Sequence, residues 1–126
     1  MKNILFFSNN TNKLREIKDL LKNLLITVLS PNDLGIDFEP KEVGKSFSEN
    51  AKIKSVYGYK NTSIPCFGDD SGISIEALGW KPNIFSKKFI SSFNNEKECF
   101  KYIIDKVKRS GKNRAYFQTS ICLTLK

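Results

Sequence analysis

The sequence predicts an α/β protein with a parallel sheet, and three features near its start indicate this fold class. Residues 4–7 form a short apolar run that ends in the polar stretch 8–12, as a buried strand followed by a turn does. Residues 14–24 place Leu and Ile at steps of three and four, which is the spacing of one helix face. Residues 26–29 form a second apolar run, which a Ser-Pro pair closes. Strand, helix and strand in this order are typical of a βαβ unit, whose two strands are parallel.

The middle of the chain predicts a second helix. Residues 35–45 are acidic and irregular, and they lead to Ser46 and Glu49, which have the spacing of a capping box. We therefore expect a helix over residues 47–60. Its apolar face is thin and consists of Ala51, Ile53, Val56 and Tyr57.

Two further strands and a third helix are predicted after residue 60. Residues 64–68 are apolar, residues 69–72 have the composition of a polar turn at the end of that strand, and residues 73–75 alternate again. Residues 95–109 have an amphipathic helical pattern that Ser-Gly stops. Residues 115–125 alternate apolar and polar side chains, which predicts a half-buried strand.

Length and composition indicate one soluble domain. The 126 residues suffice for one modest core, so we expect a single domain over residues 1–126. Apolar residues make up 40% of the chain and charged residues 27%, and no long apolar run exists, so we expect no membrane partner. The first apolar stretch is too short for a secretory signal, which predicts a cytoplasmic protein. Because nothing follows the 115–125 strand beyond Lys126, we expect a shortened chain.

The residue types that are present and absent limit the chemistry. The chain contains no histidine, which excludes Ser-His-Asp catalysis and imidazole-bound metals for this chain alone. Bases would then be carboxylates, and any metal would be a hard cation with oxygen ligands. Cys66, Cys99 and Cys122 lie far apart, which favours reduced thiols over a disulfide framework or a zinc site.

The net charge of +8 at pH 7 has two interpretations. It suits a polyanionic partner such as a nucleotide, a nucleic acid or an acidic lipid. It also follows from an AT-biased genome, because Lys supplies 18 of the 21 basic residues. The chain shows no nucleic-acid-binding module and no stripe of basic and aromatic residues, so we do not expect a nucleic-acid partner.

The loop between the first strand and the first helix has the features of a phosphate site. Free backbone N–H groups and the helix dipole favour an anion at a helix N-terminus. Ser8, Asn10 and Thr11 add short polar side chains there, and Lys13 adds a positive charge. The glycine pattern of a P-loop is absent, and an Asn-rich turn that caps the helix is the alternative interpretation.

The second candidate site is the run Asp69-Asp70-Ser71-Gly72. Two adjacent carboxylates repel each other unless a cation or a proton relieves them, and a divalent metal would do so. One aspartate would then bind Mg²⁺ while the other orients or deprotonates a water. The alternative is a solvated acidic turn. Glu42 and Glu49 are further candidate ligands, with a loop acid and a helix-cap partner as their alternatives.

Four motifs occur in a fixed order along the first 75 residues. They are Ser8-x-Asn10-x-x-Lys13-x-x-Glu16, Asp33-Leu34-Gly35-Ile36, Glu42-x-Gly44-x-Ser46-Phe47-x-Glu49-Asn50-Ala51-x-x-Lys54 and Asp69-Asp70-Ser71-Gly72-Ile73. In these motifs the chain resembles the inosine/xanthosine triphosphate pyrophosphatases, or Ham1-like family. The resemblance continues through Leu78-Gly79-x-x-Pro82-x-Ile84-Phe85-Ser86 and spans nearly the whole chain.

The resemblance implies a fold, a reaction and a site. The fold would be a mixed central sheet flanked by helices, usually in a homodimer. The reaction would be hydrolysis of damaged purine nucleotides such as ITP, dITP and XTP to the monophosphate and pyrophosphate, with Mg²⁺ as cofactor. Asp70 would be the base and Asp69 would assist it, while Glu42 and Asp70 would bind the metal. The substrate-binding residues would be Ser8, Asn9, Asn10, Thr11, Asn12, Lys13 and Ser71.

The chain departs from the family pattern at several places. Asn9 stands where the family usually has Gly, and Lys88 stands where it usually has Arg. An aromatic-Gly-Tyr-Asp-Pro loop and a Ser-His-Arg segment, which serve base and phosphate recognition in the family's C-terminal third, have no counterpart in this sequence. The alternative to an enzyme is therefore a non-catalytic, nucleotide-binding remnant of a pyrophosphatase.

Overall fold

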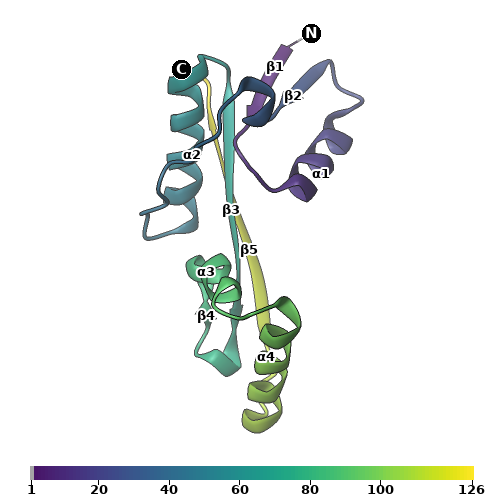
Figure 1. The fold of residues 1–126 in the computed structure, drawn as a ribbon, viewed down its shortest axis with the longest axis vertical. Coiled ribbons are helices and arrows are strands. Elements are labelled where there is room, and N and C mark those ends of the chain that lie inside the picture. The colour runs from purple at the N-terminus through teal and green to yellow at the C-terminus, as the bar shows by residue number, and fades with distance from the viewer. Residues whose placement is uncertain (1) are drawn as a thin grey trace. The chain divides into compact units, whose positions relative to one another are not determined.

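The computed structural model describes residues 2–126 and divides the chain into two compact units (Figure 1). Of the described residues, the first unit contains 2–70 and 120–126, and the second contains 71–119. Strands β3 (Cys66–Ile75) and β5 (Ala115–Thr124) each contribute residues to both units. The single domain over residues 1–126 stays a prediction.

The first unit begins with the predicted βαβ arrangement. Strand β1 (Lys2–Phe6), helix α1 (Thr11–Leu21) and strand β2 (Ile26–Leu29) follow one another, and β1 and β2 are parallel. Helix α2 (Phe47–Thr62) then leads to β3, which pairs with β1 in parallel on the side opposite β2. The sheet order is β2-β1-β3-β4, and β5 also pairs with β3. Because β3 and β4 (Lys81–Pro82) are antiparallel, the predicted mixed α/β sheet is confirmed.

Two apolar clusters cover the two faces of this sheet, because alternate residues of β1 point to opposite faces. On one face Phe6, Val28 and Phe67 are buried, and the partly buried α1 side chains Leu14, Ile17 and Leu21 pack against them. On the other face the buried residues are Leu5, Phe7 and Cys66, with Tyr57 of α2 among their partners. The sheet of this unit therefore lies between α1 and α2.

Helix α1 is shorter than its sequence pattern predicts. It ends at Leu21, and Lys22 is its C-cap residue. Leu24, which the spacing places on the apolar helix face, lies beyond the helix and is exposed, and Leu20 is also exposed. The prediction for these two leucines was wrong, since the stripe that packs on the sheet is narrower than the periodic run.

Helix α2 packs on the sheet through small residues and through part of the predicted apolar face, since Ala51 is buried and Tyr57 packs against the cluster of Leu5, Phe7 and Cys66. Its buried positions include Ala51, Ser55 and Gly58, whereas Ile53 is only partly buried. A Cβ at Gly58 would lie 2.4 Å from Cys66 Sγ, and one at Gly68 of β3 would lie 2.6 Å from the Ala51 carbonyl oxygen. Hydrophobic patterning missed Ser55 and Gly58 because a close helix–strand approach selects small residues.

The second unit contains helices α3 and α4. Helix α3 (Ser86–Ser91) follows β4 and was not predicted, because its sequence Ser-Lys-Lys-Phe-Ile-Ser has no extended apolar period. Helix α4 (Glu96–Ser110) confirms the third predicted helix. The Asn95 side chain caps its first turn, and Gly111 ends it in the left-handed region at φ 68°.

Two predictions about strands need correction. Residues 69–72, expected as a turn at a strand end, lie inside the continuous ten-residue strand β3. Strand β5 forms as predicted, but its apolar set is exposed, with Phe117 at 70% and Ile121 at 64%. The alternate residues Ser120, Cys122 and Thr124 are partly buried at the end of β5. There Thr124 Oγ1 lies 2.9 Å from Ser55 Oγ of α2.

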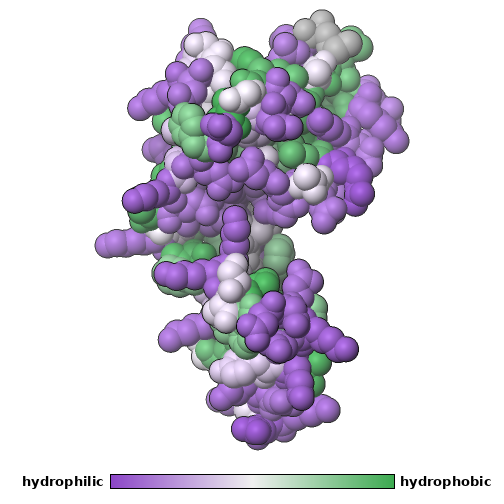
Figure 2. Space-filling model, in the orientation of Figure 1, coloured by the Kyte–Doolittle hydropathy of each residue, from purple (hydrophilic) through white to green (hydrophobic). Residues whose placement is uncertain are grey.

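Hydrophilic side chains dominate the face drawn in Figure 2, and apolar patches interrupt them. None of the helices within residues 2–126 is long and apolar enough to cross a membrane.

Candidate active site

The candidate site lies in the first unit, where the sheet topology reverses direction. From β1 the chain moves to β2 on one side, and it later returns to β3 on the other side. The pairing of β1 with β3 ends at Phe6 and Phe67, and Asp69 and Asp70 follow shortly after on β3. Crevices at such reversal points, beyond the carboxyl ends of parallel strands, are the usual ligand sites of α/β sheets.

The loop that leaves β1 is ordered by its own polar side chains. Asn10 is the N-cap of α1, and its Oδ1 accepts the backbone N–H groups of Asn12 and Lys13 at 3.0 and 3.1 Å. Ser8 Oγ accepts the Asn10 N–H at 3.1 Å. Asn9 Nδ2 donates to the carboxylate of Glu39. The capping interpretation of this loop is therefore confirmed, while its role as a phosphate site stays a prediction.

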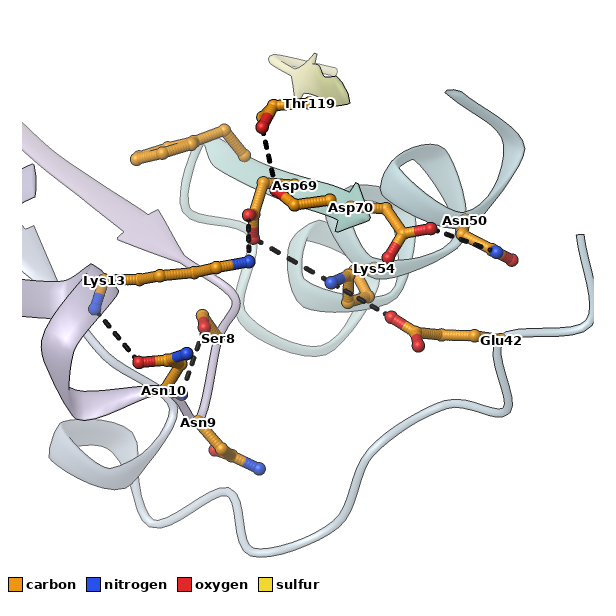
Figure 3. Close-up of polar contacts among 12 residues, drawn as sticks. Ser8, Asn9, Asn10, Lys13, Glu42, Asn50, Lys54, Asp69, Asp70 and Thr119 are labelled. Atoms are coloured by element: carbon orange, nitrogen blue, oxygen red, sulfur yellow. Dashed lines mark hydrogen bonds and ion pairs between the residues drawn. The ribbon is translucent and has the colours of Figure 1, made fainter. Parts of the chain in front are cut away.

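Lys13 extends from this loop to the acidic run on β3. Its Nζ lies 2.6 Å from Asp69 Oδ2, and the Asp69 side chain is only 9% exposed (Figure 3). This contact joins two of the predicted site segments, which are 56 residues apart in the sequence. A buried carboxylate is costly without a cationic partner, and Lys13 supplies one.

Lys54 of α2 is a second cation at the same place. Its Nζ lies 3.0 Å from Glu42 Oε1 and 3.9 Å from Asp69 Oδ1, so it stands between the two acids (Figure 3). The Lys54 side chain is 15% exposed. Glu42, Lys54, Asp69 and Lys13 thus form one row of alternating charges.

Asp70 has a different environment from Asp69. Its side chain contacts a neutral amide, since Asn50 Nδ2 donates to Asp70 Oδ2 at 3.2 Å. Burial raises the pKa of Asp70 above its ordinary value, the Asn50 hydrogen bond opposes this rise, and the charge of Glu42 adds to it. A carboxyl with a raised pKa is a candidate proton acceptor.

Ser71 belongs to the second unit. Its Oγ lies 2.9 Å from Thr119 Oγ1 of β5. Its predicted role in substrate binding stays a prediction, as do the catalytic, metal-binding and substrate-binding roles of the other site residues.

Asn50 and Lys54 were given no role in the sequence analysis, although both belong to one of the quoted motifs. They lie four residues apart on α2, so they occupy one face of the helix. An Asn and a Lys four residues apart, beside the small residues Ala51 and Ser55, were the available sequence signal. The strand that receives them could not be known from spacing.

The residues present fit a divalent cation that arrives with a phosphate ligand. Glu42 and Asp70 supply carboxylate oxygens, and they lie close enough for the Glu42 charge to raise the pKa of Asp70. Within residues 2–126, no group of three His, Cys, Asp or Glu side chains is arranged to hold a metal. Mg²⁺ commonly uses one or two carboxylates and completes its shell with phosphate oxygens and waters.

The fold and the site together define an α/β protein with a cluster of paired lysines and carboxylates at the sheet reversal. A sequence profile of the Ham1 family matches residues 4–126. The chain therefore belongs to the Ham1 family.

Curated relatives and solved structures agree with this assignment. A "dITP/XTP pyrophosphatase" of Leptospira interrogans is 36% identical over 114 residues, which are 90% of this chain and 58% of the relative. A second "dITP/XTP pyrophosphatase", from Christiangramia forsetii, is 31% identical over 123 residues, which are 98% of this chain and 64% of that relative. A HAM1 protein of Coxiella burnetii superimposes with a TM-score of 0.84 at 29% identity, covering 98% of this chain and 64% of that structure. The chain thus spans about six tenths of the length of these relatives.

Proposed function

We propose that this chain hydrolyses nucleoside triphosphates of damaged purines, dITP, ITP and XTP, to the monophosphate and pyrophosphate. The observation that carries the proposal is that Lys13 and Lys54 both contact Asp69, the sequence neighbour of Asp70, beside the N-terminus of α1. Relatives that bear the name dITP/XTP pyrophosphatase suggest the substrate class.

The loop of residues 8–13 would bind the triphosphate. The helix dipole favours an anion at this helix N-terminus, where Asn10 Oδ1 already accepts the N–H groups of Asn12 and Lys13. Lys13 would neutralise phosphate charge, and it would then exchange its contact with Asp69 for one with a phosphate oxygen. Lys54 would remain beside Asp69 and keep this buried acid compensated.

Asp70 would accept the proton of the attacking water. The water oxygen forms a bond to the α-phosphorus, the anhydride bond between the α and β phosphates breaks, and pyrophosphate leaves. The raised pKa of Asp70 suits a group that takes up a proton during the reaction. Glu42 and Asp70 would hold Mg²⁺ together with phosphate oxygens, and this ion would stabilise negative charge on the reacting phosphate when bound.

The oligomeric state, the cellular location and the partners that the family resemblance implies belong to the same proposal. We expect a homodimer in the cytoplasm, with a purine nucleoside triphosphate as its small-molecule partner. We expect neither a nucleic-acid partner nor a membrane partner.

Pyrophosphate release from dITP, with dATP as control, tests this function. We expect release in the presence of Mg²⁺, loss of release in EDTA, and a loss of about 100-fold or more in Asp70→Asn, because a general base commonly contributes this much. The ratio of dITP to dATP rates measures base selection.

The same assay separates the enzyme from a nucleotide-binding remnant. Saturable binding of dITP without pyrophosphate release, in folded protein, would contradict the proposed reaction and favour the remnant. Equal rates with and without Mg²⁺ would contradict the proposed metal dependence.

A further inference from the structure

We propose that Asn50 is a positioning residue that holds the Asp70 carboxylate and the loop carrying Glu42 in one fixed arrangement. The proposal rests on the proposed function, because it assigns the two acids a shared task. Asn50 lies in the first turn of α2 and is 4% exposed. A buried amide is costly unless its donor and acceptor are both satisfied, so its partners explain why an Asn lies here.

The Asn50 carboxamide makes one contact from each end. Its Oδ1 accepts the Gly44 backbone N–H at 2.8 Å, and its Nδ2 donates to Asp70 Oδ2 at 3.2 Å. The orientation of the amide is fixed by its neighbours. A backbone N–H can only donate and an ionised carboxylate can only accept, so the reverse orientation would lose both hydrogen bonds.

The loop can approach Asn50 only because residue 44 is glycine. A Cβ at Gly44 would lie 2.6 Å from Asn50 Oδ1 and 2.7 Å from Glu49 Cβ. Next to it, the Lys45 N–H donates to Glu49 Oε2 at 2.5 Å, and Ser46 Oγ accepts the Glu49 N–H at 3.1 Å. The loop is thus attached to the start of α2 at three successive residues.

Glu42 lies two residues before Gly44, and its carboxylate meets Lys54, one turn after Asn50 on α2. One helix face therefore fixes both acids by different means. Lys54 holds Glu42 through an ion pair, whereas Asn50 holds Asp70 through a neutral hydrogen-bond donor. A neutral holder suits an acid that must still take up a proton or a cation.

The test compares wild type with Asn50→Leu, which has a similar volume and no hydrogen-bonding group. The two readouts are kinetics of pyrophosphate release and binding of Mn²⁺, by electron paramagnetic resonance, in the presence of α,β-methylene-dITP. We expect kcat and Mn²⁺ affinity to fall about 10- to 100-fold, as for other residues that orient metal ligands. The KM for dITP should change by less than about threefold, because the residue 8–13 loop is untouched.

The matched control is Asn61→Leu, at an exposed position near the other end of α2, which should behave as wild type. If Asn50→Leu does not fold, Asn50→Asp replaces it. Asn50→Asp keeps an acceptor for Gly44 but cannot donate to an ionised Asp70, so kcat should again fall more than KM rises. Its charge-matched control is Asn61→Asp.

Three outcomes overturn the inference. They are wild-type kcat and Mn²⁺ affinity in folded Asn50→Leu, an increase in KM alone, and failure of the wild type to bind Mn²⁺ with the nucleotide analogue. Mn²⁺ binding that depends on Asn50, in a wild type that releases no pyrophosphate, would support the positioning role and reject only the proposed reaction.

Discussion

Asp69 and Asp70 are neighbours in the sequence, yet their surroundings suit them to different tasks. Asp69 is the less exposed acid and has Lys13 and Lys54 as cationic partners. Asp70 contacts the neutral Asn50, and its pKa is raised by burial. In an alternating strand two successive side chains point to opposite faces, so this difference follows from the strand that contains them.

Lys13→Met tests the proposed role of Lys13 in triphosphate binding. A charge-assisted hydrogen bond contributes about 1.5–3 kcal/mol, so we expect the Kd for the non-hydrolysable dITP analogue to rise about 10- to 100-fold. Isothermal titration calorimetry measures this constant. Lys22→Met makes the same chemical change at the exposed far end of α1 and should leave the Kd within about twofold of wild type. Equal effects of the two substitutions would refute a specific contact.

Asp70→Asn tests the environment of Asp70 through the pH dependence of stability. Because the pKa of Asp70 is higher in the folded state than its ordinary value near 3.8, the folded protein binds this proton more tightly than the unfolded chain. Stability contributed by this group is therefore lost as the pH rises past 3.8 and through the folded-state pKa. At neutral pH the ionised carboxylate is unfavourable, so removing its charge should stabilise the fold.

We thus expect the urea unfolding midpoint of Asp70→Asn to exceed that of wild type at pH 7 without metal. The difference should shrink as the pH approaches the ordinary pKa of Asp. A lower midpoint than wild type at pH 7 would show that the charged form is stabilised by the fold.

At the scale of elements, the close contact between α2 and β3 sets the position of Asn50 and Lys54 over the acidic run. The contact depends on the small residues Gly58 and Gly68, since a Cβ at either position would overlap atoms of the facing element. A shift of α2 away from the strand would also move Asn50 away from Asp70. Packing and site geometry are therefore coupled in this helix.

Gly58→Ala should destabilise the fold by about 1–3 kcal/mol, because the new methyl group would overlap Cys66 Sγ, Phe7 and Leu5. Cys66→Ala removes the nearest of these atoms and should restore part of the loss when the two substitutions are combined. Urea unfolding of both single variants and the double variant gives the coupling free energy between the two substitutions. We expect it to be favourable by about 1 kcal/mol. Additive losses would contradict the steric account.

The sequence predicts the elements of this fold better than their faces. The βαβ start, the capped α2, helix α4 and strand β5 follow from periodicity and caps that act within a few residues. The buried faces of α2 and β5 do not follow, because Ser55 and Gly58 pack by being small and the apolar face of β5 is exposed. Such properties depend on which element lies opposite.

The candidate site shows the same division. The residue types and motifs identified Lys13, Asp69 and Asp70, and the fold places Lys13 against Asp69. Asn50 and Lys54 become candidate site residues only through the packing of α2 beside β3, because no spacing rule relates residue 50 to residue 70. The contact between Asn9 and Glu39 across 30 residues of chain was likewise beyond local patterns.

For the molecule as a whole, we propose that residues 2–126 suffice for pyrophosphatase chemistry. All the residues with proposed catalytic or metal roles, and the loop of residues 8–13, belong to one compact unit. Because the chain spans about six tenths of the length of its relatives, its activity must be measured on this chain itself.

The most direct measurement is ³¹P nuclear magnetic resonance of dITP incubated with the protein and Mg²⁺. We expect a pyrophosphate signal and a dIMP signal that grow at equal rates and that are absent in EDTA and with Asp70→Asn. Orthophosphate together with dIDP would show that a different anhydride bond is cleaved. An unchanged dITP spectrum with folded protein would show that this chain does not hydrolyse dITP.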